Sequence, residues 1–335
     1  MEGIKTIGVV GVGVIGASWT ALFLYKGFKV KVYDPYPIDE ELFKKRIQAN
    51  LSDLLALDQQ TDSSHHLQDI FLNLELYNNL KDAVIDADFI QENAPERLDL
   101  KQNLYQEITS YCPEKTLIAS SSSGLKVSDF QKDATHPERI FLGHPFNPPH
   151  LLPLVEIVGG KLTDPQILKT ASEFYQSLGK HPIVLKKEVK GHVANRLQAA
   201  LWREAFSLVK EGVCSAEDVD IAITSGPGLR WALFGPYINM ELANQKGFKE
   251  AIHHLGPPMT EWWNDMQNFQ HSEETTELLE EQTKELLTHY KDVDLSQKRD
   301  KGLVDILKLS SVHDKFHRTL ILSGFCLLKI AKISL

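Results

Sequence analysis

Apolar positions at the start of the chain follow the pattern of a strand, a helix and a second strand. Residues 4–10 (IKTIGVV) form an apolar run typical of a buried strand. After a glycine-rich stretch, residues 18–27 (SWTALFLYKG) have helical spacing, and residues 28–34 (FKVKVYD) are expected to form the next strand. A strand–helix–strand unit pairs its strands in parallel, so we expect a doubly wound α/β sheet.

The same pattern continues through the first half of the chain. Further strands are expected at residues 87–93, 116–123, 139–146 and 154–160, with a helix at 98–111. Residues 38–80 are expected to form a helical excursion with a polar middle at 58–66 (DQQTDSSHH).

The periodicity changes after about residue 185. From Val193 onward the pattern is helical and poor in strands. We therefore expect an α/β domain at residues 1–185 and an all-α domain at residues 186–335. The apolar C-terminal run at 319–335 carries two lysines, and we interpret it as an amphipathic packing or subunit-interface helix.

Composition narrows the class of protein. The 335 residues carry 36 Lys and Arg against 45 Asp and Glu, a formal net charge of −9, and no basic stripe is visible, which argues against nucleic-acid binding. No stretch reaches ~18 uncharged apolar residues, so no membrane-spanning helix is expected. The three widely spaced cysteines, Cys112, Cys214 and Cys326, suit neither a disulfide framework nor a metal site, and we expect a reducing, cytosolic setting.

The glycine-rich stretch is a candidate cofactor loop. It has the form G-x-G-x-x-G between a strand and a helix, and consists of Gly11, Val12, Gly13, Val14, Ile15 and Gly16. The glycines allow a tight turn, close approach of a pyrophosphate and close packing of helix on strand. Asp34 ends the second strand 18 residues after Gly16, where a carboxylate accepts hydrogen bonds from ribose hydroxyls and repels a 2′-phosphate. The stretch therefore predicts binding of NAD rather than NADP.

Four polar residues are candidates for the chemistry. Ser123 and His144 follow or end predicted strands, Glu156 lies inside an apolar strand, and Asn195 lies where the helical domain begins. A buried carboxylate needs a partner, and His144 is 12 residues away across a proline-rich turn. Such a pair makes His144 a base for an alcohol proton, while Ser123 and Asn195 bind the reacting oxygen. A purely structural His–Glu hydrogen bond remains an equal alternative from spacing alone.

The chain resembles the 3-hydroxyacyl-CoA dehydrogenase superfamily along nearly its whole length. The matching motifs are GVGVIG, FIQENAPERLDLKQ, IASSSSGL, GHPFNPPHLLPLVEIVGG and VKGHVANRLQAALWREA. The resemblance implies a Rossmann-type NAD-binding domain followed by an all-α domain, with the His144–Glu156 dyad, Ser123 and Asn195 in the active site. It also implies that Glu96 and Lys101 contact NAD. A homodimer built through the helical domain is expected on the same ground.

Within the superfamily, the motifs look most like the carnitine dehydrogenases, which implies a carnitine-like 3-hydroxy acid as substrate. Trp231, Phe234 and Tyr237 have three-residue spacing beside Arg230. Aromatic faces suit a trimethylammonium group, and the arginine suits a carboxylate. A core aromatic stripe with a structural arginine is the alternative for each residue.

Other substrates and roles stay open. The alternatives are a short 3-hydroxyacyl-CoA, a sugar acid such as L-gulonate, or a crystallin-like protein that retains NAD without turnover. CoA users of the superfamily tend to carry a lysine-rich arm after the first strand–helix–strand unit, whereas residues 51–75 contain no Lys or Arg. This difference argues against a grip on CoA phosphates.

Overall fold

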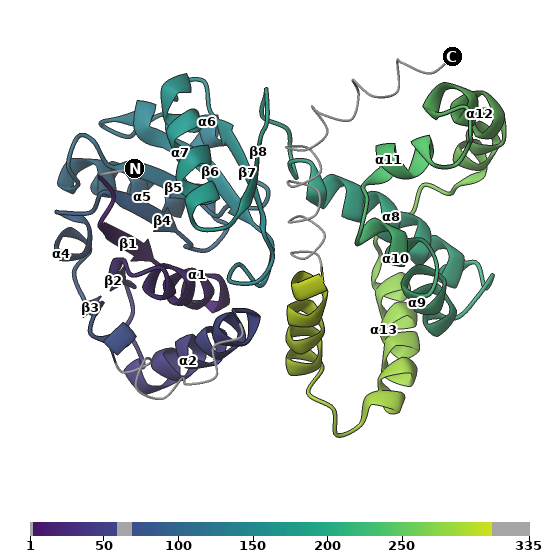
Figure 1. Cartoon of the computed structure of the whole chain (residues 1–335), viewed down its shortest axis with the longest axis horizontal. Coiled ribbons are helices and arrows are strands. Elements are labelled where there is room, and N and C mark those ends of the chain that lie inside the picture. The colour runs from purple at the N-terminus through teal and green to yellow at the C-terminus, as the bar shows by residue number, and fades with distance from the viewer. Residues whose placement is uncertain (1–2, 59–68, 310–335) are drawn as a thin grey trace, which may run out of the picture. The chain divides into compact units, whose positions relative to one another are not determined.

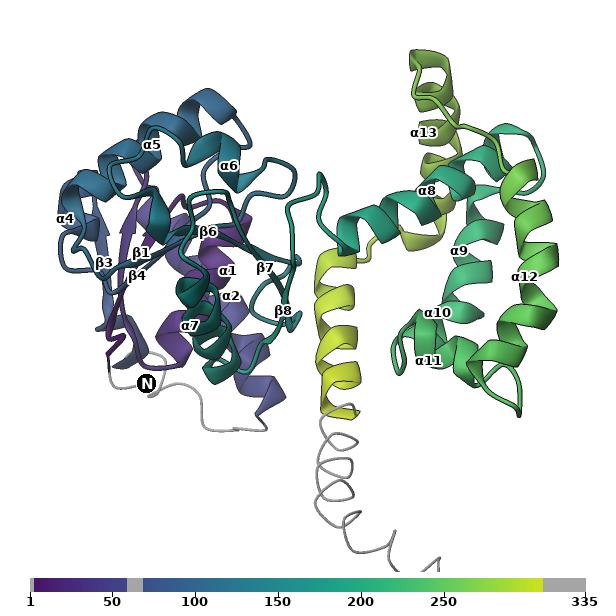
Figure 2. The ribbon, with the colours of Figure 1, turned by 90° about the horizontal axis from the view of Figure 1, so that it is seen from above.

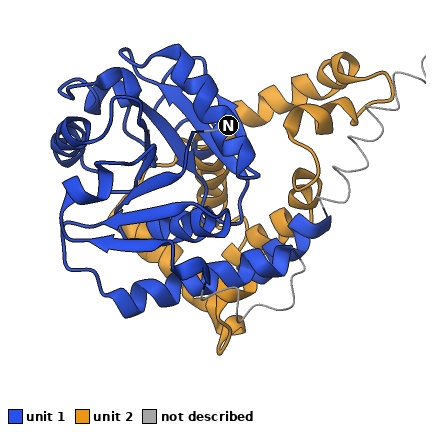
Figure 3. Ribbon diagram, turned by 60° about the vertical axis from the view of Figure 1, so that its left-hand side comes forward, with its two compact units in different colours: residues 1–195, 299–335 blue, residues 196–298 orange. Residues whose placement is uncertain are grey.

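A computed structural model describes residues 3–58 and 69–309 of the chain (Figure 1). The described residues form two compact units (Figure 3). The first contains the described residues up to Asn195 and those from Arg299 onward, and the second contains residues 196–298. Part of the expected polar stretch at 58–66 and all of the C-terminal segment 319–335 lie outside the described residues. The domain boundary expected at residue 185 stays a prediction.

The first unit is built on an eight-stranded sheet in the order β3-β2-β1-β4-β5-β6-β7-β8. Its strands are β1 (Thr6–Val10), β2 (Lys29–Tyr33), β3 (Leu74–Tyr77), β4 (Phe89–Glu92), β5 (Leu117–Ser120), β6 (Ile140–Pro145), β7 (Leu154–Gly159) and β8 (His181–Val184). All neighbouring strands run parallel except β6 and β7, which are antiparallel. The chain order reverses between β1 and β4, which is the place where doubly wound sheets bind ligands.

Helices cover both faces of this sheet (Figure 2). One face carries α1 (Val14–Tyr25), α2 (Glu40–Leu57) and α7 (Pro165–Ser177), and the other carries α4 (Leu80–Val84), α5 (Leu98–Tyr111) and α6 (Val127–Phe130). Each face has its own apolar cluster: Trp19, Phe23 and Phe174 belong to the first, and Tyr105 and Phe130 to the second. A strand buried on both faces shows a continuous apolar run, as residues 7–10 (IGVV) of β1 do. The expected doubly wound α/β fold is confirmed.

Two details of the sheet differ from the sequence expectation. The expectation that residues 38–80 are helical is wrong near the C-terminal end of that segment, where the strand β3 pairs in parallel with β2. Its four residues are too few to show an alternating pattern. The reversal at β7 follows from length, since residues 146–153 are too few for the crossover that parallel pairing needs.

The second unit is helical. Helix α8 (Ala194–Lys210) enters it and is followed by α9 (Ala216–Thr224), α10 (Pro227–Trp231), α11 (Pro236–Glu241), α12 (Phe248–Asp265), α13 (Glu273–Leu287) and the 3₁₀ turn η2 (Thr288–Tyr290). A further 3₁₀ turn, η1 (Pro137–Arg139), precedes β6 in the first unit, and residues 295–309 are helical. Among the described helices, none is both long and apolar enough to cross a membrane.

Candidate active site

The glycine-rich loop lies between β1 and α1 at the point where the strand order reverses. Gly11 has a φ of 100°, a conformation that L-residues rarely adopt. A Cβ at Gly16 would lie 1.9 Å from the carbonyl oxygen of Gly11, whereas a Cβ at Gly13 would meet nothing within 4 Å. The loop is therefore closed on the side of Gly16 and open at Gly13, where α1 begins with unpaired backbone amides. This arrangement fits a dinucleotide pyrophosphate.

Asp34 follows β2 and lies beside this loop. Its Oδ2 accepts a hydrogen bond from the backbone amide of Val12 at 3.1 Å, and its Oδ1 accepts one from the amide of Tyr36 at 3.1 Å. A carboxylate has about four acceptor sites, so both oxygens remain able to accept from ribose hydroxyls. The contact with Val12 ties the carboxylate to the loop that would hold the phosphates.

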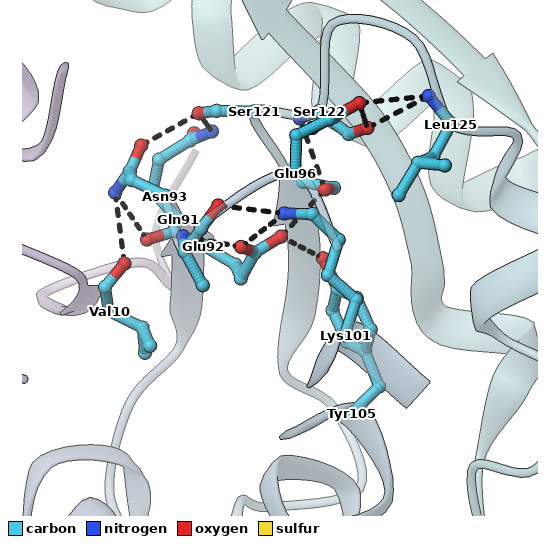
Figure 4. A network of polar contacts seen from close by, with 12 residues as sticks. Val10, Gln91, Glu92, Asn93, Glu96, Lys101, Tyr105, Ser121, Ser122 and Leu125 are labelled. Atoms are coloured by element: carbon cyan, nitrogen blue, oxygen red, sulfur yellow. Dashed lines mark hydrogen bonds and ion pairs between the residues drawn. The ribbon is translucent and has the colours of Figure 1, made fainter. Parts of the chain in front are cut away.

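A buried ion pair lies beneath the carboxyl ends of β4 and β5 (Figure 4). The Nζ of Lys101, which is 0% exposed, donates to Glu92 Oε1 at 2.6 Å and to the carbonyl of Ala94 at 3.1 Å. The second carboxylate oxygen of Glu92 accepts from the hydroxyl of Tyr105 and from Ser120 Oγ at 2.7 Å. Burial, and then the charge of Glu92, raise the pKa of Tyr105 well above its usual value.

The role of Glu92 was not predicted from the sequence. In the expected strand 87–93 only Ala87, Phe89 and Ile90 are apolar, so Glu92 lacks the apolar neighbours that identified Glu156. The sequence therefore did not show that Lys101 has an internal partner. With its ammonium paired to Glu92, the expected contact between Lys101 and a cofactor stays a prediction.

Glu96 is turned toward the serine-rich loop after β5 (Figure 4). Its Oε1 accepts from Ser122 Oγ at 2.6 Å and from the backbone amides of Gly124 and Leu125 at 2.8 and 2.9 Å. Desolvation raises the pKa of Glu96, but these hydrogen bonds outweigh it, and the net pKa is lowered. Glu96 is thus an ionised anchor for the loop that carries Ser123.

His144 and Glu156 face each other across the antiparallel pair β6–β7. They are directly opposite in register, which puts both side chains on one face of the sheet. His144 Nδ1 lies 2.9 Å from Glu156 Oε2, and Glu156 is 0% exposed. The structure thus brings together the two residues that the sequence pattern paired.

The carboxylate of Glu156 is also held by the start of α8. Its Oε1 accepts from the backbone amides of Val193 and Ala194 at 2.8 and 3.0 Å. Burial raises the pKa of Glu156, but the hydrogen bonds from His144 and from these two amides outweigh it, and the net pKa is lowered. Because Glu156 is ionised, Nδ1 of a neutral His144 carries the proton and Nε2 is left as an acceptor.

Ser123 and Asn195 also lie together. The Nδ2 of Asn195 donates to the carbonyl of Ser123 at 3.2 Å, and the side chain of Ser123 is exposed. An amide NH₂ group has two donors, so Asn195 keeps one for a substrate oxygen. Their part in the chemistry stays a prediction.

Arg230, Trp231 and Phe234 lie on α10 and the turn after it, in the second unit. Their side chains are exposed, as is that of Tyr237. The carbonyl of Arg230 accepts from the amides of Leu233 and Phe234, so the turn brings the aromatic rings onto one short segment. Each of these side chains is accessible to a ligand, and their role in substrate binding stays a prediction.

Comparisons with known proteins identify the family. The NAD-binding domain of 3-hydroxyacyl-CoA dehydrogenase matches residues 6–189, and the C-terminal domain of the same family matches residues 191–284. The chain is 39% identical to an L-carnitine dehydrogenase of Nocardiopsis dassonvillei over 92% of both chains. It is 41% identical to a 3-hydroxyacyl-CoA dehydrogenase of Gibberella moniliformis over 91% of this chain and 94% of that one.

A solved structure with the same fold is that of 5-formyl-3-hydroxy-2-methylpyridine 4-carboxylic acid 5-dehydrogenase, an NAD⁺-dependent dismutase. It superposes with a TM-score of 0.75 at 28% identity, covering 91% of this chain and 98% of that chain. The loop at Gly11–Gly16, the carboxylate of Asp34 and the matched NAD-binding domain agree on the cofactor, which is NAD. The chain therefore belongs to the 3-hydroxyacyl-CoA dehydrogenase family of NAD-dependent oxidoreductases.

Proposed function

We propose that the chain oxidises the secondary hydroxyl of L-carnitine to the ketone of 3-dehydrocarnitine. The observation that carries the chemistry is the His144–Glu156 pair, in register and 2.9 Å apart on the sheet that also holds the dinucleotide loop. The substrate is supported by the likeness to L-carnitine dehydrogenase over 92% of both chains.

In this proposal His144 is the general base. The hydroxyl proton of the substrate moves to Nε2, while Nδ1–H remains donated to Glu156, so the charge that develops on the imidazole lies against an ionised carboxylate. As the proton leaves, the C3–H bond breaks and the carbon–oxygen double bond forms. When bound, NAD supplies the hydride acceptor for that bond.

Ser123 and Asn195 bind the reacting oxygen. The exposed hydroxyl of Ser123 and the second N–H of Asn195 are donors on neighbouring segments, joined by the contact between Asn195 Nδ2 and the Ser123 carbonyl. Donors held in place before reaction stabilise negative charge on an oxygen without further reorganisation.

Arg230, Trp231 and Phe234 would recognise the two ends of carnitine. The guanidinium would pair with the carboxylate, and the indole and phenyl faces would contact the trimethylammonium group at ~0.5–2 kcal/mol per contact. We expect Arg230→Met to raise KM for carnitine at least ~10-fold with a much smaller change in kcat, since carboxylate binding is shared by ground and transition states.

Oxidation of a short 3-hydroxyacyl-CoA is the second candidate. It is favoured by the 41% identity to a 3-hydroxyacyl-CoA dehydrogenase. Against it, residues 51–75 offer no Lys or Arg to bind CoA phosphates.

The test is NADH formation at 340 nm with L-carnitine, 3-hydroxybutyryl-CoA and L-gulonate in parallel. D-carnitine and NADP serve as matched controls for the substrate and the cofactor. Turnover of L-carnitine with NAD, at least ten times that with D-carnitine or NADP, is expected. Turnover of the CoA ester alone would replace carnitine by the second candidate.

We also propose that the protein forms a homodimer and works in a reducing, cytosolic setting. The second unit exposes many large apolar side chains, including Trp262 at 57% and Trp263 at 60%, and an exposed apolar surface of this kind is typical of an interface. The two described cysteines, Cys112 and Cys214, are free thiols. Light scattering on the purified protein tests the dimer, and a mass of one chain, 37.8 kDa, would contradict it.

A further inference from the structure

A second histidine, His192, is buried beside the dyad. Its side chain is 2% exposed, and its ring centroid lies 5.2 Å from that of His144. It follows Gly191 in a turn, where Gly191 has a φ of 73° and His192 a φ of 49°. Non-glycine residues seldom adopt a positive φ, and such residues concentrate at functional sites.

The hydrogen bonds of His192 determine its tautomer. Nε2 lies 3.2 Å from the carbonyl oxygen of Ser122, which only accepts, so Nε2 carries a proton. Burial, and then the neighbouring His144, lower the pKa of His192. At neutral pH the ring is therefore uncharged, with its proton on Nε2 and a lone pair on Nδ1, for which the described residues provide no partner.

The turn that contains His192 is hydrogen-bonded both to the serine-rich loop and to Glu156 of the dyad. His192 donates to the Ser122 carbonyl, and Asn195 donates to the next carbonyl, that of Ser123. Between them, the amides of Val193 and Ala194 donate to Glu156. Four consecutive residues thus connect the serine-rich loop to the carboxylate that orients His144.

We propose that His192 is a positioning residue for hydride transfer: its neutral imidazole fixes the Ser122 carbonyl and thereby aligns Ser123 with the dyad. This inference rests on the proposed function of the same site and adds a residue to it. His192 touches neither substrate nor cofactor in this proposal, and it acts through the backbone of the serine-rich loop.

The test compares His192→Phe with His192→Gln. Both replacements meet the same backbone conformation at a positive φ, but only glutamine has an N–H donor as many bonds from the backbone as Nε2 of histidine. We expect His192→Phe to lower kcat about tenfold or more, because a buried carbonyl loses its donor, with KM for NAD within about twofold of wild type. His192→Gln should recover at least about a third of the wild-type kcat.

Two further readouts separate this role from packing. Deuterium at the reacting carbon should give a larger isotope effect on kcat in His192→Phe than in wild type, because the hydride step is the one that slows. In ¹⁵N spectra of the full-length protein, assigned by comparison with His192→Phe, the His192 ring should show the Nε2–H neutral form at pH 7.

Equal losses of kcat in the two variants, or none in His192→Phe, would overturn the proposal, as would an Nδ1–H or protonated ring. The assays use whichever 3-hydroxy acid the wild-type enzyme oxidises. If it oxidises none, the proposed function fails, while the ¹⁵N spectra still decide whether His192 holds the Ser122 carbonyl.

Discussion

Replacing Glu156 by glutamine should abolish most of the activity while leaving the size of the buried side chain unchanged. The two backbone amides that donate to Oε1 need an acceptor, so they select the amide oxygen of the new side chain. The NH₂ group must then face Nδ1 of His144, which becomes an acceptor. The proton of the imidazole moves to Nε2, and the atom that should accept the substrate proton is already protonated.

The magnitude follows from the contacts that change. Glu156 gives His144 one hydrogen bond to a charged group, and such bonds contribute ~1.5–3 kcal/mol. The wrong tautomer adds a cost of similar size, because the productive form must be regained before each turnover. A total of ~3–6 kcal/mol corresponds to a loss of about 10²–10⁴ in kcat, the usual range for acid–base catalysis.

The assay is the initial rate of NADH formation at saturating NAD, with NADH binding followed by fluorescence. Glu173→Gln is the matched control, since Glu173 is an exposed carboxylate on α7 of the same unit. We expect the control to keep full activity and both variants to bind NADH as wild type does. A kcat for Glu156→Gln within tenfold of wild type would refute the assignment of the dyad.

Three other changes have defined outcomes. Gly16→Ala would place a methyl group 1.9 Å from the Gly11 carbonyl, so we expect a lower melting temperature and no thermal shift on adding NAD; a normal shift would contradict this. Asp34→Ala should raise KM for NAD and reduce the ratio of kcat/KM with NAD to kcat/KM with NADP. If that ratio is unchanged, the carboxylate does not determine the choice of cofactor. Burial, and then the charge of Lys26, lower the pKa of Lys180 from 10.5 to about 7. Between pH 7 and 10.5 the unfolded chain therefore binds more protons than the folded chain, and the free energy of unfolding rises with pH. Lys180→Met should reduce the rise in this free energy between urea melts at pH 7 and pH 9, and an equal rise in the variant and in wild type would contradict the assignment to Lys180.

Much of the site was predictable because its residues break the apolar pattern around them. The G-x-G-x-x-G turn identified the cofactor loop, and a carboxylate inside the apolar strand 154–160 predicted a buried partner, which is His144. Both signals are local, or nearly so, along the chain. They can be recognised in a single sequence because a buried charge needs a partner, which limits the possible arrangements.

Other parts of the site depend on side-chain directions that no pattern encodes. Lys101, on α5, turns inward and pairs with Glu92 at the end of β4, nine positions earlier in the chain. The role proposed for His192 depends on its positive φ, which follows from the path of the turn after Gly191. The short strand β3 was missed because four residues carry too little pattern.

The antiparallel pairing of β6 with β7 has a consequence for how the enzyme can be monitored during refolding. Side chains alternate along a strand, so a slip of one residue in this hairpin would turn Glu156 to the opposite face from His144. The dinucleotide loop lies on β1, several strands away in the sheet order. If the proposed dyad is the catalytic base, a chain with the slipped hairpin would bind NAD but would not turn over substrate. The ratio of active sites to NAD-binding sites in a refolded sample would then give the fraction of molecules whose hairpin has the correct register.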